Sequence, residues 1–395
     1  MSDYLRRTWT QIHLDRLRAN AAIIKGKLSD GCRLMAVIKA DAYGHGAALS
    51  ARALEEAGVD WFGVSNLDEA VELRRADCHK PILIISYTPA SQAAMLAEYH
   101  ITQTVLSLQH ARELSAAAVA AGVELRVHVK IDTGMSRVGF VCHNTKDAPS
   151  VAADVVRACS LPGLVAEGIF THFASADEMD DGGYTRHQFA CFTKVTELVE
   201  RQGVLFALRH CCNSAATLRF PDMHLDMVRA GIILYGLKPD VWMDDYIAGM
   251  RPVMELKTAV SMVKTLPAGT PLSYGRTYTT ANERRIATVP IGYADGYLRR
   301  LSGCASMLVC GKRVPQVGRV CMDQCMLDVT DVPDVEEGAV VTVFGQDGDA
   351  ILPLDELAAL CDTISYELVC LLSRRVPRVY YDGDNQVALV NYLLK

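Results

Sequence analysis

Residues 34–46 read Leu-Met-Ala-Val-Ile-Lys-Ala-Asp-Ala-Tyr-Gly-His-Gly, an apolar run that ends at Lys39 and enters a turn with two glycines. A short apolar run is typical of a buried strand, and the alanine-rich segment 46–57 that follows has the pattern of an amphipathic helix. The stretch therefore predicts a βα unit whose strand ends on a lysine. An amine held there loses hydration, which lowers its pKa and lets it attack an aldehyde in Schiff-base chemistry. The hexapeptide around Lys39 fits a solvated lysine just beyond a strand equally well.

The same alternation of short apolar runs and alanine-rich amphipathic segments continues over the first 230 residues. Eight strands with intervening helices predict an α/β fold, a (β/α)8 TIM-like barrel. A doubly wound open sheet is the alternative, but no predicted strand is followed by a dinucleotide-type glycine fingerprint. The predicted strands are 34–39, 61–64, 82–86, 102–106, 124–132, 164–172, 206–211 and 225–229, and the main helices are 46–57, 67–75, 108–121, 148–159 and 184–201.

A second, mainly β C-terminal domain follows, because long helical patterns become scarce from about residue 239. Three divisions are expected: 1–15, an N-terminal strand that pairs with the C-terminal domain; 16–238, the barrel; and 239–395, the β domain. The predicted β segments are 253–264, 285–291, 306–309, 317–327 and 340–344, with one helix over 354–365.

Composition narrows the classes of function. The chain has 395 residues, a net charge of −6 and no long basic run, which disfavours a nucleic-acid partner. Its apolar stretches are too short to span a bilayer, and the first residues have no apolar signal core, so a cytoplasmic protein without a membrane role is expected. The 13 cysteines lack paired metal-ligand spacing, so they are expected to be reduced and mostly buried, and no metal site is predicted.

Polar residues fall where barrel enzymes carry their reacting groups, at the C-terminal ends of strands. Ser214, at a predicted helix start, and Gly231 could present a hydroxyl and backbone N–H groups to a phosphate. His210 is assigned to packing with Cys211 and Cys212. The residues expected on one rim are Lys39, Arg137, His172, Asn213, Ser214 and Arg229.

In the second domain, tyrosines stand in turns beside glycine or small residues, as in Ser273-Tyr274-Gly275 and Gly292-Tyr293-Ala294. Such tyrosines are usually loop anchors. A phenol acts as an acid or base near neutral pH only when nearby positive charge lowers its pKa from about 10.

These motifs together resemble one family, the alanine racemases, which are pyridoxal-phosphate enzymes built from a barrel and a β domain. The resemblance extends from Lys39 to Tyr380, nearly the whole chain, and the most specific motif is the cofactor-lysine segment 37–46. The supporting stretches are 130–140 (Lys-Ile-Asp-Thr-Gly-Met-Ser-Arg-Val-Gly-Phe), 171–174, 213–215, 229–232, 273–275, 322–323 and 364–367.

The resemblance implies an isomerase that interconverts L- and D-alanine with pyridoxal 5'-phosphate and supplies D-alanine for peptidoglycan. Lys39 would bind the cofactor aldehyde and act as the base on one face of the substrate. Tyr274 would act on the other face, reaching across from the second subunit of a homodimer whose active sites are shared. Arg229 would face the pyridine nitrogen and leave it unprotonated, because arginine does not readily release its proton.

The resemblance also assigns the remaining site residues. His172 would hold Arg229, and Lys130 matches a position that is carbamylated in many relatives. Ser136 departs from the family pattern, which commonly has glycine there. The other cofactor residues would be Tyr43, Arg137, Asn213, Ser214, Gly231, Ile232 and Tyr366, and the substrate would be bound by Arg137, Met322, Asp323 and Tyr293.

Three other activities remain open on the same sequence. A serine or broad-specificity racemase would use the same scaffold, although Tyr366 favours alanine because serine-preferring relatives carry a smaller polar residue there. A decarboxylase would release carbon dioxide and an amine. A pyridoxal-phosphate carrier without turnover would resemble only the first domain, so the residues of the β domain argue against it.

Overall fold

A computed structural model describes residues 7–394, which form two compact units. Among the described residues, the barrel unit comprises 17–42 and 47–251, and the β unit comprises 7–16, 43–46 and 252–394. The segment Tyr43–Gly46, which belongs to the cofactor-lysine motif by sequence, is therefore part of the β unit. No helix in this described part of the chain is both long and apolar enough to cross a bilayer.

The barrel unit contains a ring of parallel strands, which confirms the predicted (β/α)8 architecture. Its ladders run in the order β10-β2-β3-β4-β5-β6-β8-β9. Backbone hydrogen bonds complete the ring between its ends, from the Asp226 N–H to the Arg209 carbonyl (3.1 Å) and from the Arg229 N–H to the Cys212 carbonyl (3.0 Å). The strands are β2 (Arg33–Val37), β3 (Trp61–Val64), β4 (Ile82–Ile84), β5 (Ile101–Val105), β6 (Leu125–Asp132), β8 (Leu164–Phe170), β9 (Leu208–His210) and β10 (Met227–Ala230).

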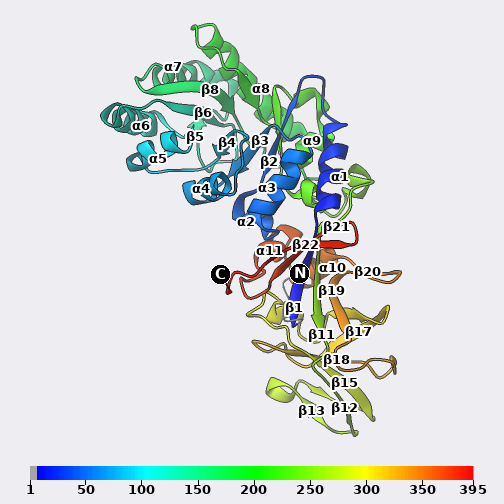
Figure 1. The fold of residues 1–395 in the computed structure, drawn as a ribbon. Coiled ribbons are helices and arrows are strands. Elements are labelled where there is room, and N and C mark those ends of the chain that lie inside the picture. The colour runs from blue at the N-terminus through cyan, green and yellow to red at the C-terminus, as the bar shows by residue number, and fades with distance from the viewer. Residues whose placement is uncertain (1–6, 395) are drawn as a thin grey trace. The chain divides into compact units, whose positions relative to one another are not determined.

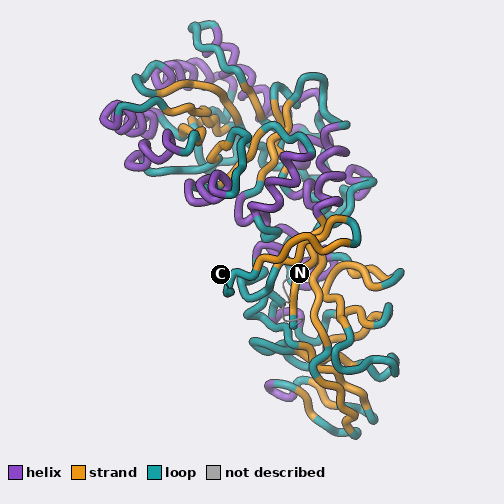
Figure 2. Tube along the Cα trace, in the orientation of Figure 1, coloured by secondary structure: helices purple, strands orange, loops and turns teal. Residues whose placement is uncertain are grey.

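Helices lie outside this ring of strands, as Figures 1 and 2 show for the barrel unit. Side-chain caps explain two of their starts: Asn66 accepts from the Glu69 N–H before α4, and Ser107 accepts from the His110 N–H before α6. Gly122 ends α6 with a left-handed φ of 67°. The helices from α1 to α9 are α1 (Leu14–Lys25), α2 (Lys39–Tyr43), α3 (Ala47–Glu56), α4 (Leu67–Arg75), α5 (Ala93–Glu98), α6 (Leu108–Ala121), α7 (Ala148–Cys159), α8 (Gly183–Glu200) and α9 (Ser214–Arg219).

The β unit is dominated by one sheet with the path β12-β15-β18-β17-β16-β19-β11-β1-β21-β22, and β20 pairs with β19. Within it, β1 (Thr8–His13) pairs antiparallel with β11 and parallel with β21. The other elements are β11 (Met254–Ala259), β12 (Met262–Leu266), β13 (Pro271–Leu272), β14 (Tyr278–Thr279), β15 (Arg284–Val289), β16 (Ser306–Val309), β17 (Lys312–Val317), β18 (Cys325–Asp328), β19 (Val340–Asp347), β20 (Ala350–Leu352), β21 (Arg378–Asp382), β22 (Asn385–Val390), α10 (Leu354–Leu360) and α11 (Ser365–Cys370).

Three predicted segments were wrong in extent. Segment 253–264 is two strands, because the chain changes partner at Val260 and Ser261: β11 pairs with β19, whereas β12 pairs with β15. Segment 317–327 is also divided, since Gly318 has φ 71° and a loop separates β17 from β18. The predicted helix 354–365 ends early at Leu360, and Asp362 (φ 58°) turns the chain before α11. The short strand β7 (Phe140–Val141), which extends β6, was not predicted.

Candidate active site

Lys39 follows β2 and begins an unusual turn, α2, at the C-terminal end of the barrel strands. The next three residues, Ala40, Asp41 and Ala42, have φ values of 51°, 55° and 53°, so the turn is left-handed. Such a conformation costs roughly 1–2 kcal/mol per residue outside glycine. Glu69 at the start of α4 supports the turn by accepting the Ala40 N–H at 2.8 Å. Strain that is held in place by neighbours is typical of functional sites.

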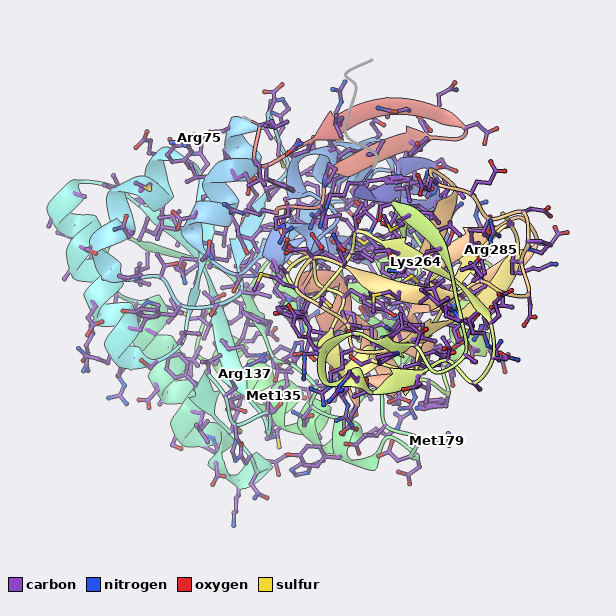
Figure 3. The ribbon with its side chains drawn as sticks, turned by 90° about the horizontal axis from the view of Figure 1, so that it is seen from below. Arg75, Met135, Arg137, Met179, Lys264 and Arg285 are labelled. Carbon is purple, nitrogen blue, oxygen red and sulfur yellow. The ribbon has the colours of Figure 1, made fainter. Side chains whose placement is uncertain are left out.

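Positive charges gather around His172 in the barrel unit. Burial lowers the pKa of His172 well below its usual value, and the charges of Arg229, Lys130, Arg137 and Lys39 lower it further. Arg137 and Met135 are labelled on the loop after β6 in Figure 3. The structure thus brings together four basic residues that are far apart in the sequence, an arrangement that suits an anionic ligand.

Arg229 on β10 is buried and makes several hydrogen bonds through Nη1 and Nη2. Its Nη2 donates to the carbonyls of Thr171 (2.8 Å) and Cys211 (2.9 Å) and lies 3.3 Å from Nδ1 of His172. Its Nη1 donates to Nδ1 of His210 at 2.8 Å. The assignment of His210 to packing alone was therefore wrong, and its place at the C-terminal end of β9 was the signal. Burial lowers the pKa of Arg229 to about 10, which still leaves it charged at neutral pH.

Lys130 is buried on β6, and its Nζ makes no hydrogen bond. The amine lies 4.7 Å from the centroid of the Phe170 ring. Burial, with the nearby charges of Arg229 and Arg137, lowers its pKa well below the usual value. Burying an amine without a hydrogen-bond partner costs free energy, so the Lys130 amine in this form destabilises the fold.

The loop after β6 is organised by Asp132. Its Oδ1 accepts the N–H groups of Gly134 (3.0 Å) and Ser136 (2.9 Å). Burial alone would raise the pKa of Asp132, but these hydrogen bonds lower it below its usual value. Ser136 has φ 55°, a left-handed conformation that accounts for glycine being common at this position. The loop therefore presents Arg137 from a defined backbone.

The residues expected to bind a phosphate meet at the starts of two short helices. Ser214 begins α9, and its Oγ accepts the Gly231 N–H at 2.9 Å. Asn213 caps α9 by accepting the Ala216 N–H at 3.0 Å. Ile232 begins the 3-10 turn Ile232–Tyr235. The Ser214 hydroxyl, which accepts from Gly231 and keeps its own hydrogen to donate, and the backbone of Gly231 and Ile232 thus lie together in the barrel unit and are named the cradle.

The β unit holds the other expected cofactor residues, Tyr43 and Tyr366, with ring centroids 6.2 Å apart. Burial raises the pKa of Tyr43, so its hydroxyl stays protonated. Gly44 and Gly46 follow directly with φ 77° and 89°. Arg378 donates to the Gly44 carbonyl at 3.1 Å, so this part of the motif is anchored in the β unit.

The expected substrate residues of the β unit lie on exposed loops. Tyr274 is 71% exposed, Met322 53% and Tyr293 42%. The loops of Tyr293 and Met322 are joined, because the Tyr293 N–H donates to the Cys321 carbonyl (3.1 Å) and the Ala294 N–H to the Met322 carbonyl (3.0 Å).

Asp295, which the sequence did not single out, supports these loops. It is fully buried and accepts the Gly292 N–H at 3.0 Å and an Arg7 N–H at 3.1 Å. Arg375 joins Asp295 (3.5 Å) to the carboxylate of Asp323 (2.8 Å). Tyr293, Met322 and Asp323 thus sit on a shared scaffold that is stabilised by charged groups. The loop of Tyr274 is held instead by the hydrogen bond from Ser273 to the Arg319 carbonyl (2.7 Å).

Comparison with known proteins agrees with this geometry. The model "Alanine racemase, N-terminal domain" matches residues 12–239, and "Alanine racemase, C-terminal domain" matches residues 253–380. An alanine racemase of Desulfovibrio desulfuricans is 47% identical over 97% of this chain and 100% of its own length.

Solved structures are similar over the same length. The alanine racemase of Bacillus anthracis with bound L-Ala-P has a TM-score of 0.91 and 37% identity, covering 99% of both chains. The Clostridium difficile 630 alanine racemase in complex with cycloserine also has a TM-score of 0.91 and 37% identity, covering 99% of this chain and 100% of that one. The chain belongs to the alanine racemase family.

Proposed function

We propose that this protein is an alanine racemase that interconverts L- and D-alanine with pyridoxal 5'-phosphate. The observation that carries the proposal is the group of basic residues Lys39, Lys130, Arg137 and Arg229 around His172, in a chain related over its whole length to alanine racemases. Bound pyridoxal phosphate withdraws electrons from the Cα–H bond of an amino acid and so makes its proton removable.

The residues present fit this cofactor. In the cradle, the Ser214 hydroxyl would donate to the phosphate, and the Gly231 N–H would exchange Ser214 Oγ for a phosphate oxygen, with the Ile232 N–H as a further donor. The family resemblance adds the hydroxyls of Tyr43 and Tyr366. Asn213 would keep the cradle in place by capping α9. Lys39 would hold the aldehyde carbon. Arg137 would serve the phenolic oxygen.

Arg229 would face the pyridine nitrogen as a hydrogen-bond donor. Its pKa of about 10 keeps the guanidinium charged near neutral pH, and its other N–H groups are already committed to His210 and backbone carbonyls. An arginine fixed in this way would leave the ring nitrogen without a proton. His172, kept neutral by burial and by the nearby basic residues, would support Arg229 without adding charge.

Two residues would move the substrate proton. Lys39 would take or return it on one face and Tyr274 on the other, which gives both enantiomers from one planar centre. The substrate carboxylate would be bound by Arg137 and the Met322 N–H, with Asp323 holding the Met322 loop through Arg375. Tyr293 and Tyr366 would restrict the entrance to a methyl-sized side chain.

Lys130 would carry a carbamate. Its lowered pKa leaves the amine neutral and nucleophilic toward carbon dioxide, and Nζ has no hydrogen bond to give up when it forms the new N–C bond and releases a proton to solvent. The added anion would pair with Arg137 and fix its guanidinium.

A homodimer with shared sites is also proposed, because Tyr274 and Met322 are exposed in a single chain. The partner's Tyr274 would then complete the site of each subunit. A cytoplasmic enzyme that supplies D-alanine for peptidoglycan fits this activity.

A chiral assay of the purified protein with pyridoxal phosphate and L-alanine tests the proposal. We expect D-alanine to form, with serine converted more slowly and no carbon dioxide released. Lys39→Ala should abolish racemisation. Borohydride should attach the cofactor to Lys39 in the unmodified protein and attach none at position 39 in the variant. Tyr274→Phe should reduce kcat/KM by at least about 100-fold in both directions, because Tyr274 takes the proton in one direction and returns it in the other. Tyr87→Phe, at another exposed tyrosine, is the matched control. Full activity of Tyr274→Phe in both directions would overturn the two-base scheme.

A further inference from the structure

A polar chain crosses the inside of the barrel unit; its inner contacts are hydrogen bonds, and its last contact, between His128 and Glu167, is longer than a hydrogen bond. From Arg229 on β10 it passes to Nδ1 of His210 on β9 (2.8 Å), and from Nε2 of His210 to Nδ1 of His128 on β6 (2.9 Å). Nε2 of His128 then lies 3.6 Å from Oε2 of Glu167 on β8. His128 and His210 are fully buried, so these contacts are their polar environment.

The chemistry of the two ends determines the proton positions between them. Arginine can only donate, so Nδ1 of His210 must be an unprotonated acceptor. A neutral His210 therefore carries its proton on Nε2 and donates it to His128. His128 in turn carries its proton on Nε2, directed at the carboxylate of Glu167. Burial lowers the pKa of both histidines, which keeps them neutral.

The barrel has local features that accommodate His128. The β6–β8 ladder has a register shift between Val127 and His128. Opposite it stands Gly168, where a Cβ would lie 2.7 Å from the His128 ring. On the other side, the ring of His210 stacks on Phe170 with centroids 4.7 Å apart. A bulge and a glycine that make room for one imidazole indicate that its position matters.

The Glu167 end of this polar chain opens toward solvent. Glu167 lines a cavity of about 370 Å³ at the N-terminal ends of the barrel strands, together with Thr102 and Arg126. Arg126 donates to Oε1 of Glu167 at 3.0 Å, and Thr102 to Oε2 at 3.3 Å. Burial would raise the pKa of Glu167, but His128 and Arg126 lower it, so the carboxylate is ionised.

We propose that Glu167 is a positioning residue for the proposed cofactor site: through His128 and His210 it fixes the tautomer that accepts from Arg229, and so fixes the guanidinium of Arg229. The inference rests on the proposed function of Arg229 as the group that faces the cofactor ring. Glu167 itself lies at the opposite mouth of the barrel and touches neither substrate nor cofactor.

Nitrogen-15 NMR of histidine in the cofactor-free protein tests the proton positions along this polar chain without any assay of activity. We expect both His128 and His210 to be neutral and protonated on Nε2 in the unmodified protein. Glu167→Leu should increase the fraction of His128 protonated on Nδ1, because Arg229 then orders the protons from one end only, whereas Glu167→Gln, which keeps an acceptor oxygen, should leave that fraction unchanged. Glu124→Gln removes another carboxylate beside the same cavity and is the control. Protonation of either histidine on Nδ1 in the unmodified protein would overturn the proposal.

Binding of pyridoxal phosphate to the same apoproteins gives the second readout. We expect roughly 10-fold weaker binding in Glu167→Leu, as is found when a partner that orients a ligand-holding side chain is lost. In the racemase assay kcat should fall more than KM changes. Gly168→Ala should weaken binding similarly by displacing the His128 ring, which covers the case in which Glu167→Leu fails to fold. Unchanged cofactor binding in both variants would reject the inference. If the unmodified protein does not racemise alanine, that result would count only against the proposed function.

Discussion

Lys130 is a single residue whose burial lowers the free energy of unfolding. Its amine is buried without a hydrogen bond, and a polar group in that state costs about 1–3 kcal/mol. Lys130→Met should therefore stabilise the cofactor-free protein by about that amount in buffer without carbon dioxide, while reducing racemisation. Urea unfolding measures the difference, and Lys146→Met, at an exposed lysine, is the control. A destabilised Lys130→Met variant would show that the amine is satisfied in solution.

The pH dependence of this effect has a defined sign. The pKa of Lys130 is lowered in the fold, so the unfolded chain binds more protons between that lowered pKa and the ordinary value of about 10.4. Stability should consequently rise with pH through this window in the unmodified protein. Because Lys130→Met lacks the titrating amine, the difference between the two proteins should shrink between pH 7 and pH 9. A constant difference would contradict the lowered pKa.

At the level of elements, the turn after α2 is constrained by close approach of its backbone. A Cβ at Gly46 would lie 1.8 Å from the hydroxyl of Tyr380, which donates to the His45 carbonyl at 3.0 Å. Gly203 has the same φ of 89° but nothing within 4 Å. Gly203→Ala should cost about 1–2 kcal/mol through backbone strain alone, and Gly46→Ala about 1–3 kcal/mol more through overpacking. Equal unfolding midpoints for the two variants would show that Tyr380 moves freely.

Strands β1, β11 and β19 share one buried carboxylate. Glu255 on β11 lies 2.8 Å from Lys257 and 3.0 Å from Arg16. Burial would raise the pKa of Glu255, but His13 and Lys257 lower it well below its usual value. Its contribution to stability should be present above about pH 4.3, the unfolded value, and be lost as pH falls below it.

Glu255→Gln should therefore destabilise the protein by about 3–5 kcal/mol at pH 7, because its buried cations lose their counter-charge. The deficit should narrow when unfolding is measured at progressively lower pH. Glu336→Gln, at an exposed carboxylate, should change little.

For the whole molecule, mixing two inactive variants tests the shared active site. Lys39→Ala and Tyr274→Phe subunits, unfolded and refolded together, should recover about a quarter of the unmodified activity, since half of the dimers are mixed and each has one intact site. Activity is measured by formation of D-alanine. If Lys39 and Tyr274 of one subunit served the same site, mixing would restore nothing.

Local patterns in the sequence were sufficient to predict the eight strands of the barrel, since each is a short apolar run bounded by an amphipathic helix. They failed where the chain changes partner, as at Val260 and Ser261, because hydrogen-bond partners depend on distant strands. The residues of the candidate site came from their places at strand ends and from the family resemblance. His210 was missed because a histidine inside an apolar segment has the same local pattern whether it packs or accepts from a distant arginine.

The sequence by itself determined the two-part architecture and the family, and it supplied the proposed reactive residues, because periodicity and motifs are local properties of the chain. Only the tertiary structure decided which groups meet: the four basic residues around His172, the Lys130 amine without a hydrogen bond, and the polar chain from Arg229 to Glu167. The physical reason is that burial and electrostatic coupling depend on distances across the barrel. Those distances arise when strands far apart in sequence close into one ring.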